Sequence, residues 1–197
     1  KGIVGVAPKV KIMPLPVFKN GTAYTSDIIN AINYAKENGA QIANCSWGAG
    51  SENTALKEAM ESSGLLFICA AGNSNKDIDA NPVYPASLTG DNIISAASIK
   101  ENGNLSRFSN YGGNSVDVAA PGEEILSTMP GNAYGISGGT SQAAAFVTGE
   151  VALILSKYPQ ASFSEIRTRL INSCDKLSSL TGKVAGGGII NCLAALA

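Results

Sequence analysis

The chain has 197 residues, of which 14 are Lys or Arg and 15 are Asp or Glu, so its formal net charge is −1. Charged residues make up 15% and hydrophobic residues 45% of the sequence, which is enough apolar material for one buried core and excludes a disordered chain. We expect no nucleic-acid partner because the charges balance, and no membrane partner because the apolar runs are shorter than the roughly 20 residues of a spanning helix.

The first half of the chain alternates strand and helix patterns. An apolar strand is expected over residues 10–15. After a polar turn, a helix is expected over residues 26–38, because apolar residues repeat at helical spacing, Ser26 suits a cap and Gly39 stops the helix. A strand over residues 41–45, a helix over residues 53–63 and a strand over residues 65–70 follow.

The second half continues the alternation. Further strands are expected over residues 93–98 and 116–119, and a long helix over residues 140–157. Ser162 and Glu165 form a capping box for a last helix that ends near residue 174. Strands that read as continuous apolar runs between helices predict an α/β domain of three layers, with a mostly parallel sheet and helices on both faces.

Parallel sheets of this kind bind ligands beyond the carboxyl ends of their strands, which draws attention to two segments. Asn73 follows the strand at residues 65–70, where its amide is placed to donate a hydrogen bond to a developing oxyanion. It is equally a turn asparagine that tolerates a left-handed conformation. Ser46-Trp47-Gly48 follows the strand at residues 41–45 and is either a peptide-pairing edge or simply a strand end.

The run Gly138-Gly139-Thr140-Ser141 carries the strongest chemical pattern. Its glycines allow a tight turn and the close approach of a ligand to the backbone. Ser141 would lie in the first turn of the following helix, where free amide groups and the positive helix end favour an anion at its oxygen. The position suits a nucleophile, although a Gly-Thr-Ser helix start is also an ordinary cap.

Histidine is absent from the sequence. Because histidine is the usual general base near neutral pH and the commonest transition-metal ligand, the ordinary forms of both chemistries are missing. No Cys-x-x-Cys pair occurs, so no metal site is predicted. Cys45 and Cys69 are expected to be buried and reduced, and a disulfide between Cys174 and Cys192 is left open.

Together, and in this order, these segments resemble the subtilisin-like serine peptidases, the subtilases. The resemblance extends from Gly2 to Asn191 and implies the same α/β fold and a serine endopeptidase that hydrolyses peptide bonds through an acyl-enzyme. Further blocks that carry it are Tyr84-Pro85-Ala86, Phe108-Ser109-Asn110, Ala119-Ala120-Pro121-Gly122 and Ala152-Leu153-Ile154-Leu155.

By position, the resemblance implies that Ser141 is the nucleophile and that Asn73 is the side-chain donor to the oxyanion, with the Ser141 amide as the second donor. It places a more distant subsite near Tyr24 or Thr25. The substrate-binding residues that it implies are Ser46, Trp47, Gly48, Ala70, Ala71, Gly72 and Thr140.

The family's catalytic aspartate and histidine would precede the segment that residues 1–8 resemble, and neither is present. We therefore interpret residues 1–197 as the C-terminal two thirds of one subtilase catalytic domain. The aspartate and histidine are expected from an N-terminal segment or a separate chain, without which this chain is inactive. The alternative is an inactive pseudo-peptidase that serves as a peptide-binding or structural subunit.

Smaller features qualify the resemblance. Gln142, Ala145 and Phe146 stand where the family usually has methionine, proline and histidine. Calcium is compatible with the family, but residues 75–81 lack the glycine and the closing glutamate of an EF-hand loop, so no metal site is predicted.

The expected partners are a peptide or protein substrate and the segment with the aspartate and histidine, and the resemblance implies secretion.

Overall fold

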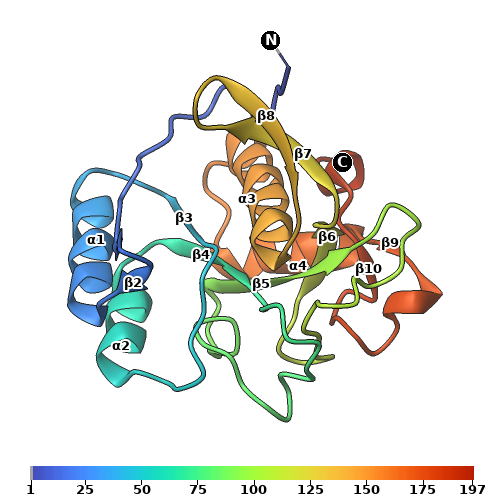
Figure 1. Cartoon of the computed structure of the whole chain (residues 1–197), viewed down its shortest axis with the longest axis horizontal. Coiled ribbons are helices and arrows are strands. Elements are labelled where there is room, and N and C mark those ends of the chain that lie inside the picture. The colour runs from blue at the N-terminus through green and yellow to red at the C-terminus, as the bar shows by residue number, and fades with distance from the viewer. Residues whose placement is uncertain (1) are drawn as a thin grey trace.

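A six-stranded sheet runs through the centre of the computed structural model, which describes residues 2–197 (Figure 1). The strand order is β3-β4-β5-β6-β10-β9, and all neighbouring strands are parallel except β9, which is antiparallel to β10. The mostly parallel sheet confirms the predicted fold class. The strands are β3 (Ile42–Cys45), β4 (Leu66–Ala70), β5 (Ile93–Ile99), β6 (Val118–Pro121), β9 (Asp175–Lys176) and β10 (Gly188–Ile189).

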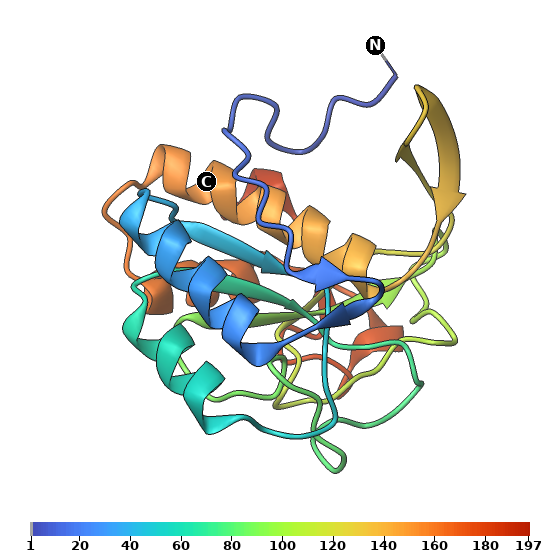
Figure 2. The same ribbon diagram turned by 60° about the vertical axis from the view of Figure 1, so that its left-hand side comes forward.

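Helices cover both faces of this sheet (Figures 1 and 2). In β4, Phe67 and Cys69 point into one buried cluster, whereas Leu66 and Ile68 point into another, because successive side chains of a strand face opposite ways. The first cluster lies under α1 (Thr25–Glu37) and α2 (Thr54–Ser62). The second lies under α3 (Thr140–Lys157), α4 (Phe163–Ser173) and α5 (Cys192–Ala195), and a short 3-10 helix, η1, spans Ser178–Leu180.

Most helices lie where the sequence pattern predicts them. The capping box of α4 is confirmed, because Ser162 Oγ accepts from the Glu165 N–H while the Glu165 carboxylate accepts from the Ser162 N–H. The expectation that Ser26 caps α1 is wrong. The helix begins one residue earlier, where the carbonyl of Tyr24 accepts from the N–H groups of Asp27 and Ile28, and Ser26 lies inside it.

The strand predicted over residues 10–15 is also wrong. Met13 and Leu15 pack against the α1 side of the core while Ile12 is 80% exposed, so the alternation of side chains is real. The backbone of residues 10–15, however, pairs with no strand among residues 2–197. The outer edge of β3 is likewise unpaired within these residues. Two residues further on, the chain forms the small hairpin of β1 (Phe18–Lys19) and β2 (Thr22–Ala23).

A second hairpin, which the sequence pattern does not predict, precedes α3. Its strands are β7 (Ile125–Met129) and β8 (Ala133–Ser137), and Asn132 has a positive φ of 57° in the turn between them. Leu126 and Ile136 on this hairpin are 55% and 67% exposed. Because β8 ends at Ser137, the hairpin leads directly into the start of α3 (Figure 1).

The α3 side of the core contains a carboxyl group. Glu150 is fully buried, and neither of its carboxylate oxygens has a hydrogen-bond partner within residues 2–197. Burial raises the pKa of Glu150 to about 7, and the nearby thiol of Cys192 acts weakly in the opposite direction. Burial also raises the pKa of Cys174 to about 11, with a smaller contribution from the charge of Glu150.

All four cysteines are free. Cys45 and Cys69, which are register partners in β3 and β4, are buried and reduced as predicted. Cys174 lies buried at the end of α4 and Cys192 begins α5, and they do not form the disulfide that the sequence left open.

Candidate active site

Ser141 lies in the first turn of α3, immediately beyond the N-cap residue Gly139 and Thr140. Its Oγ donates a hydrogen bond to the backbone oxygen of Ser46 at 3.1 Å, and Ser46 Oγ donates to the backbone oxygen of Ser141 at 3.1 Å. This reciprocal pair joins the start of α3 to the carboxyl end of β3. The helix start and the strand end that the sequence singles out are therefore in direct contact.

Asn73 follows β4 and is held against the same helix start. Its Oδ1 accepts hydrogen bonds from the N–H of Thr140 at 2.8 Å and from Thr140 Oγ1 at 3.0 Å. Because both bonds use the amide oxygen, they fix the orientation of the side chain and leave Nδ2 without an acceptor among the described residues. The N–H of Ser141, at the first helical turn, likewise has no acceptor within residues 2–197.

The segments Ser46–Gly48 and Ala70–Gly72 leave neighbouring parallel strands and approach α3 together. The N–H of Gly72 donates to Thr140 Oγ1 at 3.0 Å, so Thr140 links the second segment to the helix that carries Ser141. Gly72 has a φ of 104°, and a methyl group placed on it would lie 2.4 Å from Asn110 Nδ2. Only glycine suits that position.

Asn110 is a residue of this region to which the sequence analysis gives no role. Its Nδ2 donates to the backbone oxygen of Ala71 at 2.8 Å, and its Oδ1 accepts from the N–H groups of Ser74 and Lys76, each at 3.0 Å. The side chain thus holds the loop on both sides of Asn73. The block Phe108-Ser109-Asn110 was a signal of family resemblance, but nothing in its local pattern indicates this long-range contact.

A pocket of about 360 Å³ opens beside Trp47 and Gly48, between the β1–β2 hairpin and the start of α2. Of the two residues near which the resemblance implies a more distant subsite, Thr25 lines this pocket and Tyr24 does not. Ile28 and Leu56 supply apolar walls, with Lys57 also at the pocket. The pocket therefore lies next to the Ser46–Gly48 segment.

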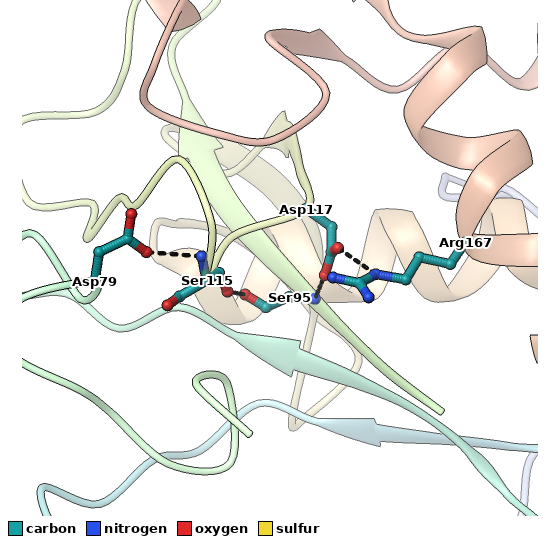
Figure 3. Close-up of polar contacts among 5 residues, drawn as sticks. All are labelled: Asp79, Ser95, Ser115, Asp117 and Arg167. Atoms are coloured by element: carbon teal, nitrogen blue, oxygen red, sulfur yellow. Dashed lines mark hydrogen bonds and ion pairs between the residues drawn. The ribbon is translucent and has the colours of Figure 1, made fainter. Parts of the chain in front are cut away.

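Away from Ser141, the carboxylates of Asp79 and Asp117 are engaged by protein groups (Figure 3). Burial raises the pKa of Asp117, and the ion pair with Arg167 at 2.6 Å and the N–H of Ser95 at 2.7 Å partly offset this. For Asp79, burial acts to raise the pKa, but hydrogen bonds from Ser115 and Asn114 outweigh it and leave the pKa lowered.

Within residues 2–197, no three acidic or cysteine side chains come together in a group that could hold a metal ion. Asp79 lies in the segment 75–81, and its oxygens accept from Ser115 N at 2.7 Å and from Asn114 N at 3.0 Å. The carboxylates of Asp79 and Asp117 serve the protein's own donors, and no chemical step is assigned to calcium.

The site therefore combines a serine hydroxyl with two free donors, Asn73 Nδ2 and the Ser141 N–H, but no side chain within residues 2–197 accepts the hydroxyl proton. The acceptor of the Ser141 hydroxyl proton is a backbone oxygen, and the sequence contains no histidine. An unassisted serine hydroxyl is a weak nucleophile. The arrangement can bind an oxyanion and carry an acyl group, provided that a base comes from elsewhere.

Comparisons with known proteins show similarity over nearly the whole chain. The family model described as "Subtilase family" matches residues 1–187. Subtilisin DY of Bacillus licheniformis is 38% identical over 199 residues, an alignment that covers 98% of this chain and 71% of that protein. Subtilisin-like protease 2 of Plasmodium falciparum is 37% identical, over 96% of this chain but only 15% of its own length.

Among solved structures, a protease from Pseudoalteromonas arctica PAMC 21717 superposes with a TM-score of 0.89 at 32% sequence identity. The superposition covers 99% of this chain and 65% of the solved chain. The fold is therefore shared over nearly all of the described residues, while the chain spans about two thirds of the solved protease.

Proposed function

Because the chain belongs to the subtilase family of serine peptidases, we propose that it supplies the nucleophile, the oxyanion donors and the acyl-side substrate groove of a serine endopeptidase. One observation carries this proposal. Thr140 occupies the oxygen of Asn73 through two hydrogen bonds, so the amide nitrogen is left to donate next to the nucleophile-bearing turn. A purely structural asparagine would not need a free Nδ2 at the start of the helix that carries Ser141.

In the proposed reaction, Ser141 Oγ attacks the carbonyl carbon of the scissile peptide bond while its proton passes to a base. The carbonyl oxygen becomes an oxyanion, to which Asn73 Nδ2 and the N–H of Ser141 donate. The base then protonates the leaving amine, the C–N bond breaks, and an acyl-enzyme remains on Ser141. Water hydrolyses this ester by the same steps in reverse order.

We propose that the base is a histidine, oriented by an aspartate, that lies outside these 197 residues in an N-terminal segment or a separate chain. The absence of histidine from the sequence supports this assignment. The Ser141 hydroxyl must then exchange its bond to the Ser46 carbonyl for one to the incoming imidazole. Without the histidine the chain is expected to be inactive.

Two structural features favour a polypeptide segment as the missing partner. The outer edge of β3 has no neighbour among the described residues, so its backbone groups are available to another strand. Large apolar side chains are exposed on the N-terminal segment and on the β7–β8 hairpin, including Val4 at 78%, Ile12 at 80% and Ile136 at 67%. Exposed apolar groups of this kind mark surfaces that other protein segments cover.

The substrate in this proposal is a peptide or protein in extended conformation, which lies along the segment Ser46–Gly48 with its acyl side toward Trp47. No helix within residues 2–197 is both long and apolar enough to cross a membrane. We propose that the peptidase acts outside the cell, as its resemblance to the subtilases implies.

Labelling with a fluorophosphonate tests the proposal, because this reagent modifies only an activated serine. The chain of 197 residues alone and the intact assembly with its aspartate- and histidine-bearing segment are treated in parallel, and the modified residue is identified by peptide mapping. We expect modification of Ser141 in the assembly and none in the chain alone. Ser141→Ala, which keeps the fold, is the matched control and should remove the label.

Two outcomes would contradict the proposal. A folded assembly that is inert to the reagent would favour the alternative of a peptide-binding or structural subunit. Labelling of Ser141 in the chain alone, at a rate close to that of the assembly, would show that the base does not come from outside these residues.

A further inference from the structure

We propose that Val83 fills the base of the primary specificity pocket and restricts the residue on the acyl side of the scissile bond to small side chains, those of Gly, Ala and Ser. This inference rests on the proposed function for the location of the pocket, between the Ser46–Gly48 and Ala70–Gly72 segments. It goes further by naming the class of side chain that the pocket accepts.

One methyl group of Val83 lies close to both Gly48 and Gly72. A methyl group placed on Gly48 would lie 3.0 Å from Val83 Cγ1, and one placed on Gly72 would lie 3.8 Å from the same atom. Since carbon atoms in ordinary contact are about 3.5 to 4.0 Å apart, a methyl group on either glycine would be in contact with Val83 Cγ1 or too close to it. The two glycines open the pocket at the walls, and Val83 closes it at the base.

The backbone around Val83 is held from both sides. The N–H of Val83 donates to Ser87 Oγ at 3.1 Å, and its carbonyl accepts from the Ser87 N–H at 2.8 Å. Next to it, Tyr84 exchanges two backbone hydrogen bonds with Ala49, at 2.7 and 2.8 Å. The second pair joins this loop to Ala49, which directly follows the Ser46–Gly48 segment. The loop cannot move away from that segment unless both of these hydrogen bonds break.

The side chain of Val83 has little freedom of its own. Valine is branched at Cβ and adopts few rotamers, and Val83 also packs against the core cluster on the α1 side of the sheet. A large substrate side chain would have to displace this methyl group or overpack the site. Crowding of that kind is unfavourable in well-packed protein interiors, whereas an alanine or serine side chain needs no displacement.

Peptide binding to the full 197-residue chain tests the inference without requiring catalysis. The probes are two N-acetyl tetrapeptide acids that differ only in the last residue, Ala or Phe, and the signal is the fluorescence of Trp47, the single tryptophan, beside Gly48. We expect the Ala peptide to bind at least about tenfold more tightly than the Phe peptide. In Val83→Gly, the Phe peptide should bind at least about tenfold more tightly than it does to the unmodified chain.

Two further variants separate pocket size from other effects. Val83→Ala keeps Cβ and should give an intermediate gain for the Phe peptide, which preserves the test if the glycine variant does not fold. Val83→Thr has the same shape as valine and should retain the preference for Ala. Equal binding of the two peptides to the unmodified chain, no binding of either peptide, or no gain for the Phe peptide in both shortened variants would each overturn the inference. Selective binding by the chain, together with a folded assembly that fluorophosphonate does not label, would refute the peptidase and leave the small pocket standing.

Discussion

Glu150 makes the stability of the chain depend on pH in a direction that can be measured. Its carboxyl group is buried in the α3 core without a hydrogen-bond partner among residues 2–197, and burial raises its pKa to about 7. In the unfolded chain the same group titrates near 4.5. The folded state therefore holds the proton more tightly than the unfolded state.

The sign of the effect follows from this difference. Below about pH 4.5 both states carry the proton and the contribution of Glu150 to stability is complete. As the pH rises toward 7, the unfolded chain is ionised and the folded chain is not, so the free energy of unfolding falls, and the loss is complete once the pH has passed the folded pKa. The full shift corresponds to about 3 kcal/mol. We expect a loss of about 1 to 2 kcal/mol, because the protein relaxes and water penetrates when the buried group ionises.

Glu150→Gln keeps the size of the side chain and removes its titration. We subtract the free energy of unfolding of the unmodified chain from that of the variant. This difference should increase by about 1 to 2 kcal/mol from pH 5 to pH 8, because only the unmodified chain is destabilised as the pH rises. Urea denaturation followed by Trp47 fluorescence at several pH values measures it. Glu58→Gln, at an exposed position on α2, is the matched control and should show no such increase. A difference between Glu150→Gln and the unmodified chain that does not change with pH would refute the reasoning.

Three further substitutions address the site and its supports. Asn73→Asp keeps the acceptor for Thr140 but removes the donor, so turnover by the assembled peptidase should fall about 100- to 1,000-fold, the loss known for removal of this donor in a subtilisin; unchanged turnover would exclude Asn73 from the oxyanion site. Arg167→Ala removes the charged hydrogen bond to the buried Asp117 and should cost about 2 kcal/mol in urea denaturation. Ser162→Ala removes the α4 cap and should cost about 1 kcal/mol by the same measurement, with retained stability arguing against the capping role.

The sequence predicted those parts of the fold whose cause is local. Helix α3 has the expected bounds because its apolar spacing and its glycine start lie within the helix itself, and the capping box of α4 is complete within four residues. The strand expected over residues 10–15 shows the limit of such reasoning. Its side chains alternate as in a strand, but a strand also needs a partner, and no local pattern reveals that the neighbouring edge of β3 is open.

The candidate site divides in the same way. Ser141, Asn73 and the two glycine-bounded segments could be named because residue type and position beyond a strand or before a helix already restrict their chemistry. The contacts that organise them could not be predicted. Asn110 reaches Ala71 across 39 residues of sequence, and Ser46 meets Ser141 across 95, so only the folded chain brings these partners together.

The open side of β3 has a consequence for the chain by itself. Its four residues include no charged side chain and no proline, which are the usual means by which edge strands discourage pairing with other molecules. Only the shortness of the strand opposes the stacking of one copy onto another. The lifetime of the free chain in solution should therefore depend on its concentration, because a second molecule can pair with the same row of backbone groups that we propose the partner segment uses.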